Sequence, residues 1–407
     1  MEQTNPRRDH YKLFSEGRIG PLTLPNRLVR SATWDPAILQ ARRMTDGVLD
    51  IYRRVAAGGI GLIITGDSSV IPHGLLDEDP PQPAAFAYED VRIEGYDRLV
   101  ETVHTTAPGC KIVAQLSVDY PGFGPSDVPS PFLTERTRPL STEQVRLLVH
   151  CLVESITGIQ GEGFDGVQLH AAHGGLLGRF LSPYTNRRRD EYGGSVANRA
   201  RLVREVVAGA RQKVGDFPIL IKLNGTDYLP GGLDLDTFPD LAREIAAAGF
   251  DAIEVSGGMW ECLVRPETEL GFRPVPAPES HTRIKDPAKQ SYFLPYAERL
   301  ELDIPLILVG GNRDAERLEA ILQRGVVEFL ALCRPLISEP DLPRRWLEGR
   351  GSSGSDCISC NSCLYDMYTS LENGQPGPVT CLFKQDRQRV GEAQRWLASW
   401  VRDNAAP

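Results

Sequence analysis

Residues 163–211 read GFDGVQLHAAHGGLLGRFLSPYTNRRRDEYGGSVANRARLVREVVAGAR. An apolar run, Gly166–Leu169, leads into His170, and a second histidine, His173, follows in a turn rich in glycine and alanine. A polar loop comes next, followed by apolar residues at helical spacing. A strand, a loop and a helix, with ionisable side chains directly after the strand, form the unit from which an α/β barrel builds a site. Two histidines at this spacing can bind zinc, but no third ligand follows nearby in the sequence, so we predict no metal there.

The same alternation of strand and helix patterns continues along the chain. Most of the strand-length segments are continuously apolar, as expected for parallel strands that are buried on both faces. We therefore predict an α/β fold, a closed (βα)8 TIM barrel, preceded by a hairpin-like segment at Leu13–Leu24. The predicted barrel strands are Arg27–Ala32, Gly61–Thr65, Lys111–Leu116, Gly166–His170, Pro218–Leu223, Ala252–Ser256, Pro305–Val309 and Phe329–Cys333.

Capping residues indicate where helices begin. Ser141 and Gln144 are spaced as a capping box for the helix that follows them. Asn312 or Asp314 can cap another helix, predicted over Ala315–Arg324. Both helices fall between predicted strands, as the barrel requires.

Composition and charge exclude several classes of protein. The 407 residues carry 45 basic and 54 acidic side chains, a net charge of −9, which argues against a nucleic-acid or membrane-surface partner. No run of about 18 apolar residues occurs, so no membrane span is expected. The N-terminal residues MEQTNPRRDHYK do not resemble a secretory signal, and scattered single cysteines suggest a reducing compartment, so we expect a cytoplasmic protein. The sequence leaves the oligomeric state open, a homo-oligomer included.

Two long insertions, Ser117–Leu140 and Gly257–Lys289, interrupt the alternation. Each follows the end of a predicted strand, so we expect both over the C-terminal mouth of the barrel, where they would shape access to a substrate. Surface loops without such a role are the alternative.

The motifs FLSPYTNRRRDEYGG (180–194) and GGSVANR (193–199) are long and specific, and smaller matches extend from about Leu13 to about Trp346. In these motifs the chain resembles the Old Yellow Enzyme family, the FMN-dependent ene-reductases also called NADH:flavin oxidoreductases. The resemblance implies a TIM barrel, an FMN cofactor, NADH or NADPH as the donor and an α,β-unsaturated carbonyl or related compound as the small-molecule acceptor. The segment RSATW (30–34) resembles a branch near the 2,4-dienoyl-CoA reductases.

An FMN phosphate needs backbone N–H groups and a cation. Gly310 and Gly311 follow the seventh predicted strand, and Cys333 and Arg334 follow the eighth, the usual phosphate site of this fold. The glycines allow close approach of the backbone, and the guanidinium is a forked donor suited to phosphate. These four residues are therefore predicted to bind the phosphate.

The resemblance also assigns residues to the flavin ring. It places Gln115 on the flavin amide and the backbone of Ser31, Ala32 and Thr33 beside the ring. Lys222 lies inside an apolar strand, where its charge needs an anion, and an anionic reduced flavin would supply one. A lysine–carboxylate pair inside the barrel is the alternative interpretation.

His170 and His173 match the pair that binds the acceptor's oxygen in this family. Polarising that oxygen lets a hydride add to the β-carbon, after which a proton must reach the α-carbon. In most relatives a tyrosine two residues after the second histidine gives this proton, but here that position is Gly175. Tyr120, Tyr184 or water could replace it, or the enzyme could be a variant isomerase, dehydrogenase or oxidase.

The barrel domain is predicted over residues 10–350 and a small cysteine-containing extension over 351–407, joined by a linker at Gly349–Ser355. Four soft thiolates can bind an iron–sulfur cluster or zinc. The gaps between these cysteines differ from those of cluster-binding relatives, and we favour reduced thiols over a cluster. The cysteines are Cys357, Cys360, Cys363 and Cys381.

Two further functions stay open at this point. One is a flavin-free barrel aldolase that uses Lys222 as a Schiff base. The other is a catalytically silent flavin-binding or ligand-binding protein, which the glycine at position 175 makes plausible. A flavin spectrum and turnover of NAD(P)H separate these from the reductase.

Overall fold

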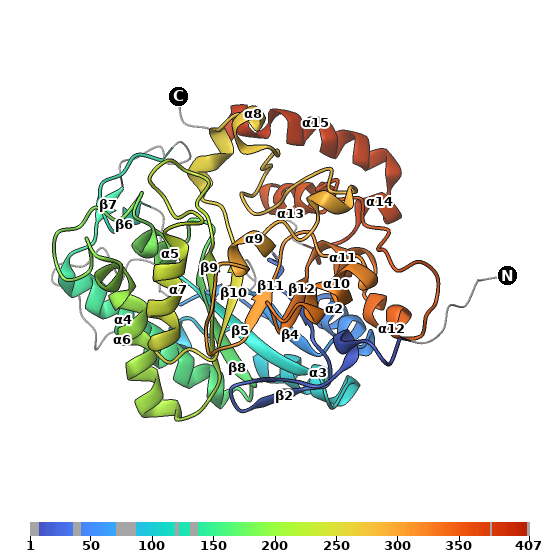
Figure 1. The fold of residues 1–407 in the computed structure, drawn as a ribbon, viewed down its shortest axis with the longest axis horizontal. Helices are drawn as coiled ribbons and strands as arrows, with labels where there is room; N and C mark the ends of the chain where they lie inside the picture. Colours follow the sequence, from blue (N-terminus) through green and yellow to red (C-terminus); the bar gives the residue numbers. More distant parts are fainter. Residues whose placement is uncertain are drawn as a thin grey trace.

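The computed structural model describes residues 8–35, 42–70, 87–118, 122–130, 137–374 and 377–404. Its centre is a closed barrel of parallel strands, each overlapping one predicted segment, so the predicted TIM barrel is confirmed (Figure 1). The strands, in order around the barrel, are β10 (Ala252–Ser256), β11 (Leu306–Leu308), β12 (Phe329–Leu332), β3 (Leu28–Arg30), β4 (Leu62–Ser69), β5 (Lys111–Ser117), β8 (Gly166–Ala171) and β9 (Ile219–Asn224).

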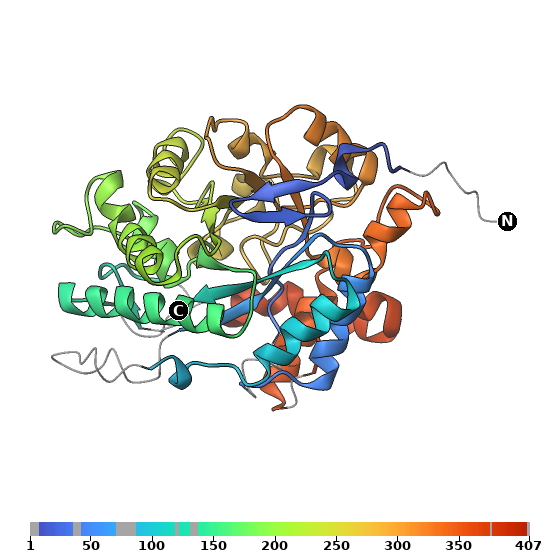
Figure 2. The same ribbon diagram turned by 90° about the horizontal axis from the view of Figure 1, so that it is seen from below.

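A short antiparallel hairpin, β1 (Gly17–Ile19) and β2 (Leu22–Leu24), closes the lower end of the barrel, as Figure 2 shows. Its apolar side chains join those inside the barrel in one buried cluster. This plug leaves the opposite end, where the strands terminate, as the mouth of the barrel. The interior cluster consists of Ile19, Leu22, Leu24, Val29, Leu62, Ile64, Val113, Leu220, Ala252, Ile307, Phe329 and Ala331.

Helices surround the barrel and bury their apolar faces against it. Ser141 and Gln144 form the expected capping box at the start of α4, and Asp314, rather than Asn312, caps α10. Asn312 instead donates to the carbonyls of the two neighbouring strands. The outer helices are α2 (Asp46–Ala57), α3 (Tyr96–Thr106), α4 (Thr142–Gly161), α5 (Leu176–Leu181), α6 (Val196–Val214), α7 (Phe238–Ala247), α9 (Leu294–Ala297), α10 (Ala315–Gln323), α11 (Arg334–Ser338) and α12 (Leu342–Leu347).

The two insertions form little regular structure. In the first, residues 119–121 and 131–136 lie outside the described part, and the rest includes β6 (Phe123–Gly124) and β7 (Arg138–Pro139). The second holds η5 (Trp260–Val264), α8 (Glu267–Leu270) and η6 (Pro287–Lys289). The remaining 3-10 turns are η1 (Lys12–Phe14) and η4 (Tyr88–Asp90).

The C-terminal extension folds onto the second insertion at the upper side of the molecule in Figure 1. Leu397 and Trp400 share an apolar cluster with Leu263 and Val275 of the insertion, and Tyr368 packs against this cluster. The extension therefore belongs to the cover of the barrel mouth. Its helices are α13 (Ser362–Glu372), α14 (Leu382–Gln385) and α15 (Arg387–Asn404).

The segment Gly349–Ser355 is fixed in place, which corrects its interpretation as a linker. The Ser353 hydroxyl donates to Asp314 at 2.7 Å, and the Ser355 hydroxyl donates to Glu339. Arg345 donates to the backbone of the same segment. Glycine and serine composition predicts flexibility, but these three polar side chains hold the backbone of the segment.

Within the described residues, no helix combines the length and the apolar character needed to cross a bilayer.

Replacing Asp314 tests this attachment. Its carboxylate accepts from the N–H groups of Glu316 and Arg317 and from the Ser353 hydroxyl, so Asp314→Ala removes a helix cap together with a charge-assisted hydrogen bond. We expect a loss of about 2–3 kcal/mol in the free energy of unfolding in urea, and faster proteolysis near the fixed segment. Ser195→Ala, which removes only the cap of α6, should cost about 1 kcal/mol. Equal losses in the two variants would contradict the attachment.

Candidate active site

A pocket opens at the mouth of the barrel, and each barrel strand contributes a lining residue at its end or directly after it. Its empty volume is about 790 Å³, which includes the part open to solvent. The second insertion adds Glu279 and Ser280, as expected of a segment that shapes access. The contributions of the strands are Ser31, Asp67, Gln115, His170, Lys222, Ser256, Val309 and Ala331.

All but one of the predicted site residues line this pocket. They are Ser31, Ala32, Gln115, His170, His173, Lys222, Gly310, Gly311, Cys333 and Arg334. The exception is Thr33, whose hydroxyl donates to the carbonyl of Ser31 at 3.2 Å and lies 3.4 Å from the sulfur of Cys333. Its side chain is thus turned away from the pocket and packs behind the wall.

The loops after β11 and β12 form a cradle. Gly310 and Gly311 have φ values of 105° and 77°, a backbone that other residues rarely adopt. A Cβ at Gly310 would lie 2.5 Å from Phe293, and one at Gly311 would lie 2.9 Å from Tyr292. Both the backbone and the packing against the two aromatic rings therefore require glycine here, and both glycines line the pocket.

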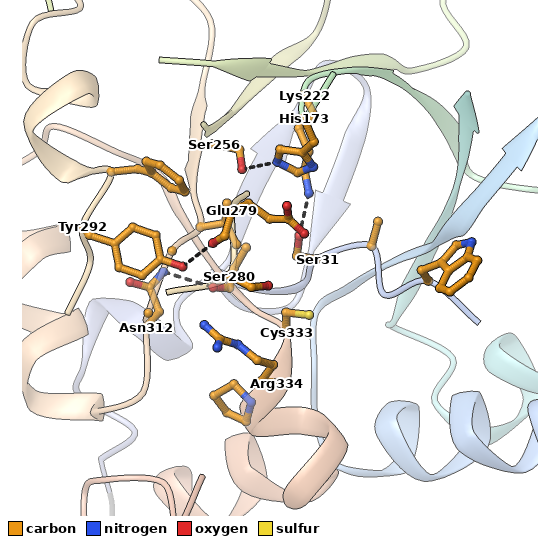
Figure 3. Close-up of a pocket in the computed structure, with 18 of the residues that line it drawn as sticks. Ser31, His173, Lys222, Ser256, Glu279, Ser280, Tyr292, Asn312, Cys333 and Arg334 are labelled. Carbon is orange, nitrogen blue, oxygen red and sulfur yellow. Dashed lines mark hydrogen bonds between the residues drawn. The ribbon is translucent and has the colours of Figure 1, made fainter. Parts of the chain in front are cut away.

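Two buried guanidinium groups lie at this end of the pocket. Arg334 donates to the carbonyl of His281 at 2.8 Å and to the Asn361 side chain at 2.5 Å, and Figure 3 shows it below Cys333. Arg313 donates to the carbonyl of Cys357 at 2.8 Å. Within the described residues neither arginine forms an ion pair with a carboxylate. Buried cations without a counterion favour an anionic ligand such as a phosphate group.

Sequence reasoning missed Arg313, although it stands in the same VGGNRD motif as the predicted glycines. Burial lowers the pKa of its guanidinium, and the charge of Arg334 lowers it further. The partner that fixes it, the carbonyl of Cys357, lies in the C-terminal extension. No pattern along the chain signals that contact.

At the opposite end, a buried network surrounds Glu254. Its carboxylate accepts from the Ser31 hydroxyl at 2.6 Å and from Gln168 at 2.8 Å, and it pairs with the Lys222 ammonium at 3.2 Å. Lys222 also donates to the Ser31 hydroxyl at 2.9 Å, a contact drawn in Figure 3. Gln168 accepts in turn from Gln115 at 2.6 Å.

The lysine–carboxylate alternative therefore describes a real contact of Lys222. An ammonium group carries three donors, and Ser31 and Glu254 take two of them. Lys222 also lines the pocket, so one donor remains for a ligand. Glu254 was not foreseen, although a glutamate inside the apolar strand AIEVS was a signal of a buried partner.

The two histidines are partly buried at and just after the end of β8, with their ring centroids 5.1 Å apart. Burial lowers the pKa of both imidazoles, so both are neutral near pH 7. The His173 ring contacts the Ser256 hydroxyl at 2.7 Å, and its backbone N–H donates to Asn224. Nδ1 of His170 is buried and has no partner among the described residues. Such an atom indicates a polar ligand that completes the site.

Gly175 begins α5 next to these rings. Its φ of −60° and ψ of 156° suit any residue. A Cβ there would lie 3.5 Å from Nδ1 of His170, an ordinary contact. The fold thus admits a side chain at this position, and the glycine is not a steric requirement.

The structure does not identify either tyrosine considered as a replacement acid as the proton donor. Tyr184 lies beside Arg187, and it is not among the residues that line the pocket. Tyr120 lies outside the described residues. Neither position therefore identifies the proton donor.

The tail cysteines lie near the anion end of the pocket. Burial raises the pKa of Cys357 and Cys363, and the charge of Arg334 acts in the opposite direction on both thiols. All eight cysteines of the chain are free. In the described part, no set of three or more His, Cys, Asp or Glu side chains is arranged to hold a metal ion.

These features define a barrel enzyme with an anion site after its last two strands and polar groups at its strand ends. The chain belongs to the NADH:flavin oxidoreductase / NADH oxidase family, whose model matches residues 12–352. Enzymes of this family use FMN with NAD(P)H.

The chain is 32% identical over 370 residues to NADH oxidase of Thermoanaerobacter brockii, covering 86% of this chain and 52% of that protein. It is 31% identical over 392 residues to cinnamate reductase of Clostridium sporogenes, covering 87% of this chain and 55% of that protein. The chain thus spans about half the length of these relatives. A structure of 2-naphthoyl-CoA reductase with 2-naphthoyl-CoA superposes with a TM-score of 0.74 at 22% identity, over 94% of this chain and 58% of that one, which shows the shared fold.

The residues that line the pocket fit FMN in their charges. Arg313, Arg334 and the cradle at Gly310 and Gly311 suit a phosphate, and Lys222 at the other end retains a donor for the ring. Both ends belong to one pocket, as an elongated molecule with one anionic end requires.

Replacing Arg334 tests the phosphate end. Arg334→Ala should weaken FMN retention by roughly 1–3 kcal/mol, the scale of a charge-assisted hydrogen bond, measured as the dissociation constant for FMN added to the apoprotein. Arg324→Ala, which removes an exposed arginine paired with Glu298, serves as the control and should leave FMN affinity unchanged. Equal affinity in the two variants would place the phosphate elsewhere.

The buried pair of Lys222 and Glu254 leads to two predictions of opposite sign for the flavin's reduction potential. Lys222→Met should lower the flavin's reduction potential, because it removes positive charge that stabilises the anionic reduced ring. Glu254→Gln removes negative charge from the same place and should raise the potential. Shifts of about 20–40 mV correspond to roughly 1–2 kcal/mol for a two-electron couple. Potentiometric titration of both variants decides, and shifts of the same sign would remove the pair from the flavin site.

Proposed function

We propose that this protein is an FMN-dependent oxidoreductase that carries hydride from NAD(P)H to an alkene conjugated with a carbonyl group, or to a related acceptor. The observation that carries this proposal is the pair of neutral histidines that line one pocket together with Lys222, Arg313 and Arg334, whose charges suit FMN. FMN, when bound, would accept hydride from NAD(P)H and pass it to the acceptor. The proposed catalytic domain is residues 10–350, and the extension 351–407 forms part of its cover.

The chain's own residues bind and orient. Arg313, Arg334 and the glycine cradle would hold the phosphate, and Lys222 would face the anionic edge of the ring. Neutral imidazoles carry one N–H donor each, which suits a carbonyl oxygen on which negative charge develops. Burial keeps their pKa low, so this donor pattern persists across the physiological pH range.

The relatives support the acceptor class without fixing the substrate. Cinnamate, in the name of one relative, is an aryl-conjugated unsaturated carboxylate, and 2-naphthoyl-CoA, in a structural neighbour, is an aromatic thioester. Trp34 in the pocket wall, with Tyr368 behind it at 5.9 Å between ring centroids, adds an aromatic surface suited to such compounds. Eight free cysteines support a reducing compartment such as the cytosol.

Variants of the two histidines test the proposal. His173 has a φ of 55°, a backbone that glycine tolerates, so we choose His173→Gly, which removes the donor, and His170→Ala as a separate variant. We expect the purified protein to be yellow, NAD(P)H to reduce it, and 2-cyclohexenone or cinnamate to reoxidise it. Each variant should slow reoxidation by about 10²–10³-fold, the effect of removing one donor to a developing oxyanion. The exposed His10→Ala is the control.

Two outcomes would contradict the proposal. A reduced protein that no conjugated alkene reoxidises would exclude the acceptor class. Unchanged reoxidation in both histidine variants, at unchanged FMN content, would exclude their role in holding the acceptor's oxygen.

A further inference from the structure

The proposed reaction needs an acid at the pocket, and Gly175 cannot supply one. Glu279 is a pocket-lining carboxyl on the second insertion, which covers the barrel mouth. Figure 3 shows its side chain directed into the pocket, between Tyr292 and the pair formed by Ser31 and Lys222. We propose that Glu279 is the proton donor that replaces the family's tyrosine. This inference rests on the proposed alkene reduction.

The backbone around Glu279 is held firmly. Its own carbonyl accepts from the Tyr292 hydroxyl at 2.7 Å. Asn361 of the C-terminal extension donates to the carbonyl of Ser280 at 3.1 Å, and Arg334 donates to that of His281. Three side chains from three parts of the chain thus fix the segment that carries the carboxyl. A group held in this way can deliver a proton to a defined place.

The charges around Glu279 place it in the same part of the pocket as the histidines. Lys222 acts electrostatically on Glu279, His170 and His173, and Asp67 acts on Glu279 and His170. In the described part of the chain, Lys222 forms its ion pair with Glu254 and not with Glu279. The Glu279 carboxyl is therefore not occupied as a structural counterion.

Burial raises the pKa of Glu279, and the charge of Asp67 raises it further, whereas Lys222 and Arg334 lower it. Tyr292, Tyr368 and Cys262 also face this carboxyl, and all three are neutral because burial raises the pKa of each group. A carboxyl whose pKa is raised keeps its proton to higher pH than a free carboxyl, which suits a general acid. The protonated carboxyl is therefore present at pH values below its raised pKa, and it is lost as the pH rises through that pKa.

The proposed step conserves atoms and electrons. A hydride adds to the β-carbon, a C–H bond forms there, and the alkene's π electrons move to the carbonyl oxygen as an enolate held by the histidines. The α-carbon then takes the proton of the Glu279 carboxyl, whose O–H bond breaks. The resulting carboxylate regains a proton from solvent, and NAD(P)H supplies the two electrons.

Glu279→Gln in the FMN-loaded protein tests this role, because the amide keeps the size of the side chain and gives no such proton. We expect the reoxidation of the reduced protein by 2-cyclohexenone to slow by about 10²–10⁴-fold, and its decline at high pH to disappear. Reduction by NAD(P)H needs no such proton and should keep its rate. Glu267→Gln, in the exposed part of the same insertion, is the matched control.

A second variant and a second readout separate this role from a structural one. Adding Gly175→Tyr to Glu279→Gln returns the family's phenol at a position where a Cβ makes only ordinary contacts, so it should restore reoxidation. Infrared difference spectra of the apoprotein across pH should show a protonated carboxyl band that Glu279→Gln removes. Reoxidation unchanged in Glu279→Gln, or abolished instead by Tyr368→Phe, would overturn the proposal. Failure of NAD(P)H to reduce the flavin would instead reject the proposed function itself.

Discussion

The buried guanidinium of Arg334 is the constraint on which the parts of this site depend. It stands at the start of α11, directly after the last barrel strand, and donates to His281 of the second insertion and to Asn361 of the extension. A buried cation must be surrounded by acceptors or meet an anion. The same group therefore joins barrel, insertion and extension, and leaves a positive end to the pocket that a phosphate can fill.

A second buried charge organises the other end of the pocket. Glu254 is fully buried, and its two oxygens are engaged by Ser31, Gln168 and Lys222. Because the charges of Glu254 and Lys222 balance each other, the buried ammonium group of Lys222 needs no further anion. The charges at the Glu254 end of the cavity thus balance each other within the protein, whereas the arginines at the other end form no ion pair with a carboxylate of the described residues. An elongated molecule with one anionic end therefore has one preferred orientation in the cavity.

The sequence predicted the features that have local causes. Continuous apolar segments located all eight strands, and the motif residues Gly310, Gly311 and Arg334 line the pocket as expected. What it missed depends on contacts between distant segments: the identity of Glu254 as the carboxylate that pairs with Lys222, and the contact of Arg313 with the extension. The segment rich in glycine and serine was mistaken for a linker, because composition reports chain flexibility but not the side chains that arrive from elsewhere.

The glycine at position 175 leaves this position without an acid, and the proposed replacement acid lies on the insertion that covers the barrel mouth. Its backbone and its surroundings accept a side chain, so the fold does not explain the missing phenol. The carboxyl of Glu279 reaches the pocket on an insertion that the extension clamps through Asn361. If the acid is supplied from the cover and not from the strand end, the extension becomes part of the proton supply, because it fixes the segment that carries the acid.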